Sequence, residues 1–193
     1  CIRDRGYALC VVNTGGDHGD LTDDYAAIRK EMEAVAAHFG KHVLREVELE
    51  TVESHIGELR RACGDRAVLR ALHYYDENAR VLEQAAAIRG GDLPAFFDAV
   101  KRSGDSSWKL LQNVYARSTE EQMAMGIELS RRFLHGDGAQ RVHGGGFAGT
   151  IQAYVPLDRL DDYKKLMENA FGPGSCTALM VRPEGAVMMP MEG

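Results

Sequence analysis

A cluster of four glycines, between Arg141 and Thr150, constrains this chain more than any other feature. The stretch reads RVHGGGFAGT. Glycine has no Cβ, so its backbone adopts conformations and close approaches that other residues cannot. The flanking residues are typical of strands, which we predict at 139–143 and 150–155. A glycine-rich connection between two strands indicates a bulge, a sharp bend or a bare surface against which another group packs.

The spacing Gly144-x-Gly146-x-x-Gly149 formally matches two nucleotide-binding patterns. The dinucleotide fingerprint needs a helix after the loop, and the strand expected at 150–155 excludes it. The glycine-rich loop of protein kinases fits a strand-turn-strand, but no His-Arg-Asp or Asp-Phe-Gly follows. The absence of Gly-Lys-Ser/Thr excludes a Walker loop. The spacing alone leaves two readings open, a tight structural turn and a surface that faces a ligand.

Hydrophobic periodicity and turn signals predict an α+β domain with an antiparallel sheet backed by helices. Further strands are expected at 7–12, 176–182 and 186–189, the last two joined as a hairpin. Helices are expected at 22–39, 51–63, 65–89, 92–102, 118–135 and 157–171. We expect Leu82 on the apolar stripe of the helix at 65–89. Ser103–Asp105 is expected to break the pattern after the helix at 92–102, and Ser118 to Glu121 is expected to form a capping box at the start of the helix at 118–135.

Length and composition limit the class of protein. A chain of 193 residues with 45% hydrophobic residues has the size of one globular domain with a core. A net charge of −6 argues against nucleic acid as the main partner. No apolar run approaches the ~18 residues of a membrane span. The four cysteines form no Cys-x-x-Cys pair, so we expect reduced thiols and a cytoplasmic protein.

A second polar cluster runs from Asn13 to Tyr25, at the end of one expected strand and the start of a helix. It contains a carboxylate or amide at positions 13, 17, 20, 23 and 24 and an imidazole at 18. Such groups at a strand end often contact ligands. The alternative is a helix start with Thr22 or Asp23 as its cap and a solvated acidic first turn.

Three histidines elsewhere are weaker candidates. His38 and His42 have a helical metal-ligand spacing, but Gly40 lies between them and no third ligand is evident, so we expect no metal site. His73 is expected to be a packing histidine.

Taken together, these segments resemble galactokinases, members of the GHMP family of small-molecule kinases. Residues 6–25 resemble the opening of the C-terminal half of these enzymes, and 141–150 resembles the third GHMP motif. Residues 73–93 resemble their helical insert. The resemblance covers nearly the whole chain, and it implies a GHMP kinase C-terminal domain over residues 1–193. That domain has a four-stranded antiparallel sheet, backing helices and an extra helical insert.

The resemblance also implies a reaction, in which ATP, with magnesium, transfers its γ-phosphate to the anomeric hydroxyl of galactose. It places Tyr25 on a sugar hydroxyl, and Gly144, Gly145 and Gly146 beside the sugar and the phosphate-binding loop. The family's N-terminal sugar signature, ATP loop and catalytic aspartate have no counterpart here. We therefore expect no catalytic residue in this chain, which begins at Cys1 and enters a strand almost at once.

The same reasoning predicts an isolated C-terminal domain that is inactive alone. Its expected partners are its own N-terminal domain, galactose and ATP, with no nucleic acid and no membrane; ATP and magnesium would be held mainly by the missing half. Two other readings stay open. One is a non-catalytic sugar sensor or partner-binding protein on the same fold, and the other is a GHMP kinase for a different small acceptor.

Overall fold

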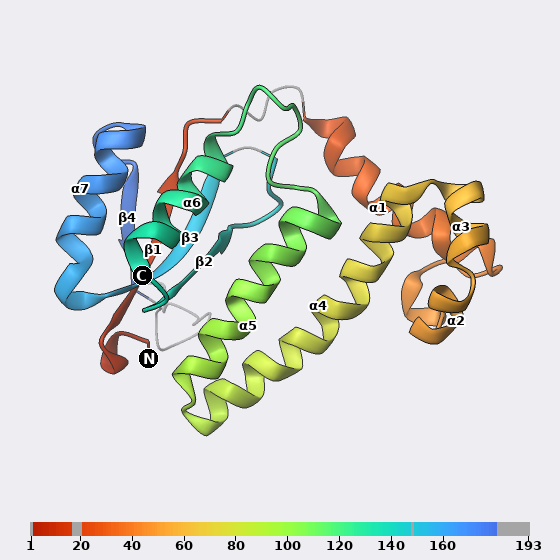
Figure 1. The fold of residues 1–193 in the computed structure, drawn as a ribbon, viewed down its shortest axis with the longest axis horizontal. Coiled ribbons are helices and arrows are strands. Elements are labelled where there is room, and N and C mark those ends of the chain that lie inside the picture. The colour runs from red at the N-terminus through yellow and green to blue at the C-terminus, as the bar shows by residue number, and fades with distance from the viewer. Residues whose placement is uncertain (1, 17–20, 148, 181–193) are drawn as a thin grey trace, which may run out of the picture.

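A four-stranded antiparallel sheet forms the base of the structure, a computed structural model that describes residues 2–16, 21–147 and 149–180. The strand order is β2-β3-β1-β4 (Figure 1). The strands are β1 (Tyr7–Asn13), β2 (Ala139–Val142), β3 (Thr150–Pro156) and β4 (Cys176–Leu179). This sheet and its covering helices confirm the predicted fold class. The predicted strand at 186–189 and the hairpin leading to it lie outside the described residues.

Strand β1 lies inside the sheet and pairs along its whole length with β3, from Tyr7 opposite Pro156 to Asn13 opposite Thr150. Its side chains alternate between buried and partly buried positions. This alternation is the two-residue period of a strand whose faces lie in different surroundings. The pairing brings the end of β1 next to the start of β3, where the glycine-rich loop ends.

Helices α6 (Gln122–Leu134) and α7 (Leu160–Phe171) cover one face of the sheet (Figure 1). Their apolar faces and the sheet form the largest core. Its most buried members include the following residues: Cys10, Val12, Met123, Leu134, Ile151, Ala153, Val155, Tyr163 and Met167. Burying such side chains removes apolar surface from water, about 25 cal/mol per Å², so this core anchors the sheet.

Helix α5 (Leu93–Ser106) covers the opposite face near β2 and runs beside the long helix α4 (Asp65–Gly90) (Figure 1). Phe96 and Phe97 pack on Tyr154 of β3, with ring centroids 5.3 and 5.6 Å apart. Asp92 begins α5 by accepting a hydrogen bond from the Ala95 amide at 3.0 Å. That cap is the usual way to satisfy an open helix N-terminus.

A helical lobe lies away from the sheet and has its own core (Figure 1). It contains α1 (Thr22–His38), α2 (Leu49–Ser54), α3 (Ile56–Cys63) and the first turns of α4. Its fully buried side chains include Val35, Ala36, Val52, Leu59 and Ala71. α1 leads from the sheet into this lobe, and α4 leads back.

The predicted break at Ser103–Asp105 is wrong, because α5 continues to Ser106 and then widens into a π-helical turn at Ser107–Leu111. Gly104 ends no helix here. A Cβ at this position would lie 3.1 Å from the Gln140 carbonyl oxygen, so glycine allows α5 to approach β2 closely. Ser103 is fully buried and donates to Glu77.

Three other predictions about helices are also wrong. The expected capping box is not formed, since α6 begins at Gln122 with no side-chain cap. The helix expected at 51–63 is divided at His55, whose Nδ1 lies 2.8 Å from the Thr51 carbonyl oxygen. Leu82 is 72% exposed, because α4 turns a stripe of mutually paired polar groups toward α5.

Neither Thr22 nor Asp23 caps α1; Leu21 occupies the cap position, without a side-chain hydrogen bond. Within the part of the chain that the structure describes, we find no helix with the length and apolar composition needed to cross a bilayer.

Candidate functional site

The glycine-rich loop closes the β2–β3 hairpin and exposes backbone. His143 N donates to the Thr150 carbonyl at 3.0 Å, the last ladder bond before the loop. Gly144 and Gly146 have φ of 70° and 82°, in the left-handed region that favours glycine. The structure thus confirms that a strand, and no helix, follows the loop.

Tyr25, in the first turns of α1, lies directly against this loop. Its hydroxyl donates to the Gly146 carbonyl at 2.7 Å. A Cβ at Gly145 would lie 2.8 Å from Tyr25 Cε1, so the ring covers a position that only glycine can occupy. Partial burial raises the pKa of Tyr25, which keeps the phenol protonated at neutral pH. The structure therefore brings together the tyrosine and the glycines that the resemblance singled out separately.

Asn113, which follows the π-helical turn, holds the loop from its other side. Its side-chain amide donates to the Gly145 carbonyl at 3.0 Å, and its backbone carbonyl accepts from the Phe147 amide. A Cβ at Gly146 would lie 2.1 Å from that Asn113 carbonyl oxygen. Asn113 is 2% exposed. Sequence reasoning missed this residue, because its spacing from the loop carries no motif.

The end of β1 completes the support. Thr14 donates from both its amide, at 2.7 Å, and its hydroxyl, at 2.9 Å, to the Gly149 carbonyl. Asn13 accepts from the Gly15 amide at 2.9 Å, a local turn that needs no ligand. Residues 17–20, including the candidates Asp17, His18 and Asp20, lie outside the described residues.

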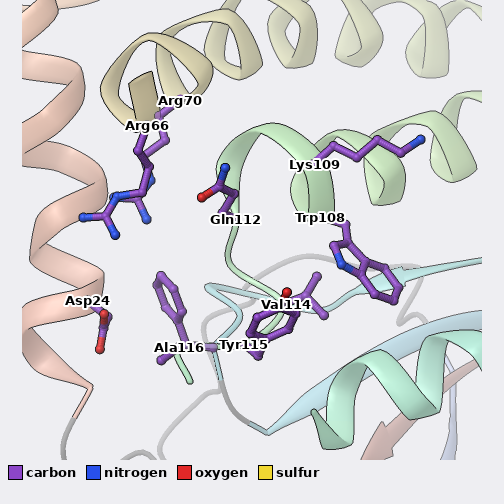
Figure 2. Close-up of a pocket in the computed structure, with 10 residues that line it drawn as sticks. Asp24, Arg66, Arg70, Trp108, Lys109, Gln112, Val114, Tyr115 and Ala116 are labelled. Carbon is purple, nitrogen blue, oxygen red and sulfur yellow. The ribbon is translucent and has the colours of Figure 1, made fainter. Parts of the chain in front are cut away.

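A hollow of about 410 Å³ adjoins the loop (Figure 2). Phe147 of the loop lines it and also contacts Tyr25 edge to face, with ring centroids 5.2 Å apart. The other lining residues come from α1, α4 and the segment after α5: Asp24, Arg66, Arg70, Trp108, Lys109, Gln112, Val114, Tyr115 and Ala116. This hollow and the Tyr25–glycine contact therefore share a wall.

The histidine candidates lie apart from this site. His73 is buried, and its Nδ1 lies 2.8 Å from the Ser106 hydroxyl; burial lowers its pKa. That is a packing role, as predicted. His38 Nε2 lies 3.8 Å from Glu58 Oε2, while His42 follows the end of α1. Among the described residues, no three His, Cys, Asp or Glu side chains converge as metal ligands.

The sheet and its covering helices define an α+β domain, and comparisons with known proteins show which proteins it is similar to. The chain is 29% identical over 164 residues to the galactokinase of Mannheimia succiniciproducens and 30% identical over 164 residues to that of Haemophilus influenzae. In each case the match covers 85% of this chain and 41% of the relative. No protein-family model matches the chain.

A solved structure shares the fold. The crystal structure of Lactococcus lactis galactokinase complexed with galactose superposes with a TM-score of 0.70 at 17% identity. The superposition covers 91% of this chain and 45% of that one. The predicted resemblance is thus confirmed: over most of its length this chain is similar to galactokinases, and it spans about two fifths of the length of the curated relatives it matches.

Proposed function

We propose that this chain is the C-terminal domain of a galactokinase-like sugar kinase. The longer protein that contains it, called the parent protein here, would transfer the γ-phosphate of ATP to the anomeric hydroxyl of galactose. In this proposal residues 1–193 form one domain, which supplies a wall of the sugar site. ATP, magnesium and the catalytic groups would be held by the N-terminal part of the parent protein, and the chain alone would not turn over.

One observation carries the proposal. Tyr25 and the glycine loop, which the resemblance assigns to the sugar independently, are in direct contact although Tyr25 and Gly146 are 121 positions apart. The hydrogen bond to Gly146 fixes the phenol, so little side-chain entropy remains to be lost when a sugar binds. The bare face of Gly144, where a Cβ would meet nothing within 4 Å, leaves room for a phosphate or a sugar to lie against backbone.

Phosphoryl transfer depends mainly on positioning and charge stabilisation. In the proposal, Tyr25 and the glycine loop therefore orient the acceptor. They neither give up nor take up a proton in the reaction. Tyr25 would position a sugar hydroxyl. Because the loop glycines have no side chains, they would leave the path of the transferred group open.

The proposal is tested by assaying ATP-dependent phosphorylation of a panel of hexoses, pentoses and small alcohols. We expect the parent protein to turn over galactose preferentially and the chain alone to show no turnover. Clear turnover by the chain alone would contradict the division of labour. Turnover of another acceptor in preference to galactose would contradict the substrate, and binding of galactose by a parent protein without any turnover would indicate a sugar sensor.

A further inference from the structure

A second hollow lies at the open edge of the sheet, where α5 and α6 both contact β2, and is called the edge hollow here (Figure 1). Its volume of about 560 Å³ falls within the range of roughly 300–1,000 Å³ that small-molecule sites occupy. Its lining residues come from α5, from the end of α6 and the turn after it, and from β2: Lys101, Arg131, Arg132, His135, Gly136 and Gln140. It shares no lining residue with the hollow beside the glycine loop.

The lining of the edge hollow has an excess of positive charge. Lys101, Arg131 and Arg132 are cations, and no carboxylate of the described residues lines the hollow. One carboxylate, that of Glu128, accepts from both arginines at 2.7 Å. This pairing lowers the pKa of Glu128 to about 2, so its charge persists at neutral pH. Three cations and one carboxylate leave two positive charges in excess.

Other carboxylates on the surrounding elements are already bound elsewhere. Those at positions 98, 105 and 137 each have a donor within 3.0 Å, on Arg102, Lys109 and Tyr7 respectively. Lys101 makes no ion pair with any residue that the structure describes. Its ammonium group is therefore free to bind a ligand in the hollow.

The end of α6 carries a partial negative charge, which opposes an anion. Its last carbonyl groups are already engaged, however, since those of Arg131, Phe133 and Leu134 each accept a hydrogen bond. The full charges of the lining cations therefore outweigh this partial charge.

Gln140 adds a backbone donor at the edge of the sheet. In an antiparallel ladder, residues alternate between bonding to the neighbouring strand and facing away from it. His143 N donates to the Thr150 carbonyl, which makes 143 a bonded position. Arg141 therefore also faces β3, and the amide of Gln140 faces the open edge. Main-chain N–H groups at a sheet edge contribute to anion-binding concavities.

We propose that the edge hollow binds a small phosphorylated anion that carries no nucleobase. Lys101, Arg131 and Arg132 would donate to its oxygens, together with the His135 ring and the Gln140 amide. Hydrogen bonds between charged donors and phosphate are among the strongest that proteins make. No Phe, Tyr or Trp of the described residues lines the hollow, so it offers no stacking surface for a base. The hollow is larger than one phosphate group needs, so pyrophosphate or a phosphate ester fits better than inorganic phosphate.

The proposal is tested by calorimetric titration of the chain with pyrophosphate, glycerol phosphate and inorganic phosphate in turn, with phosphorus NMR as a second measurement. We expect saturable binding of at least one of the first two, with a Kd of about 0.1–1 mM at low salt. Inorganic phosphate should bind more weakly. Tighter binding of pyrophosphate would identify an inorganic ligand and tighter binding of glycerol phosphate an ester, and either supports the proposal.

Two lysines and one glutamate give variants with different expected effects. Lys101→Gln removes a cation that lines the hollow, whereas Lys165→Gln removes an exposed one on α7. We expect Lys101→Gln to weaken binding of the tighter ligand by ~5-fold or more, and Lys165→Gln to leave it within ~2-fold. Glu128→Gln frees Arg131 and Arg132 from their carboxylate and should tighten binding by ~3-fold.

Three results would overturn the proposal. They are no saturable binding of pyrophosphate or glycerol phosphate by both measurements, equal weakening by the two lysine variants, and a Glu128→Gln chain that binds less tightly than the wild type. The chain is titrated without the rest of the parent protein, whose proposed ATP site would itself bind these anions. Because the titrations contain neither ATP nor galactose, this proposal and the proposed phosphoryl transfer fail separately.

Discussion

At the scale of single residues, the three consecutive glycines of the loop are required for different reasons. Gly145 faces the ring of Tyr25, and Gly146 faces the backbone of Asn113. Gly144 has a left-handed φ of 70°, but a Cβ there would meet nothing within 4 Å. Backbone cannot move aside as a flexible side chain can, so the contact of Gly146 with Asn113 is the strictest of the three.

We therefore predict a graded response to alanine substitution. Gly146→Ala combines a φ of 82° with a Cβ 2.1 Å from the Asn113 carbonyl oxygen, and should destabilise the chain by ~3 kcal/mol or more. Gly144→Ala has only the backbone penalty and should cost ~1–2 kcal/mol. Urea unfolding of both variants measures the difference. Equal losses of stability would show that the Asn113 contact is not rigid.

Part of this site could be predicted from the sequence and part could not. The resemblance named Tyr25 and the glycines, and the structure places them in contact. Asn113 hydrogen-bonds to the loop through its side chain and its backbone, and a π-helical turn places it there. No local sequence pattern predicts that turn or its position beside the loop. The role of Asn113 can therefore be recognised only in the folded structure.

At the scale of elements, the α4–α5 pair combines close backbone approach with buried polar groups. Gly104 lets α5 lie against β2. His73 and Glu77 of α4 face α5, where they hydrogen-bond to the hydroxyls of Ser106 and Ser103. Buried polar groups are tolerated when they satisfy one another. This pairing connects the helical lobe to the strand that carries the glycine loop.

Two helical glycines provide a test of the close approach. Gly104→Ala would place a Cβ 3.1 Å from the Gln140 carbonyl oxygen, so we predict a destabilisation of ~1–3 kcal/mol. Gly90→Ala, at the end of α4, meets nothing within 4 Å and should be neutral or stabilising by up to ~1 kcal/mol. Thermal unfolding compares them. A Gly104→Ala chain as stable as Gly90→Ala would refute the role of this contact.

The buried histidine predicts a pH dependence. Burial lowers the pKa of His73 below its ordinary value, so the unfolded chain binds a proton there more readily than the folded chain. Its contribution is fully present above pH ~6.5 and is lost as pH falls through the folded pKa.

Replacing His73 by Gln should flatten the stability profile between about pH 7 and 5, measured as the urea midpoint at each pH. His42→Gln, at an exposed position, is the control and should leave the slope as it is in the wild type. An unchanged slope in His73→Gln would show that another group governs this pH range.

The elements themselves were predicted unevenly, for physical reasons. Strands β1 and β3 and helices α1 and α7 follow from the hydrophobic period, because their buried faces are apolar or nearly so. Ser103–Asp105 looked like a break because small and polar residues usually end helices. Here tertiary contacts reverse that preference: Ser103 is bonded inside the fold and Gly104 is a packing position. The hydrophobic period predicts Leu82 on the buried face of α4, but Leu82 is exposed. Around it, α4 buries polar side chains such as His73 and Arg80 instead.

At the scale of the whole molecule, two packed bodies meet beside the glycine loop. α1 comes from the helical lobe to place Tyr25 on the loop, and the segment after α5 brings Asn113 to its other side (Figure 1). The chain matches about two fifths of each galactokinase relative. The proposed wall of the acceptor site is thus built from segments that are far apart in the sequence. Because the chain matches only part of its relatives, the function of this wall is best measured in the parent protein.

The most direct measurement is the KM for galactose of the parent protein carrying Tyr25→Phe, with Tyr75→Phe as the control. Tyr75 donates to the Leu44 and Val47 carbonyls inside the helical lobe, so its variant also loses hydroxyl hydrogen bonds, but away from the loop. We predict that Tyr25→Phe raises the KM by about 2- to 12-fold, the equivalent of one lost hydrogen bond, while Tyr75→Phe leaves it unchanged. An unchanged KM in Tyr25→Phe would contradict the proposed sugar contact.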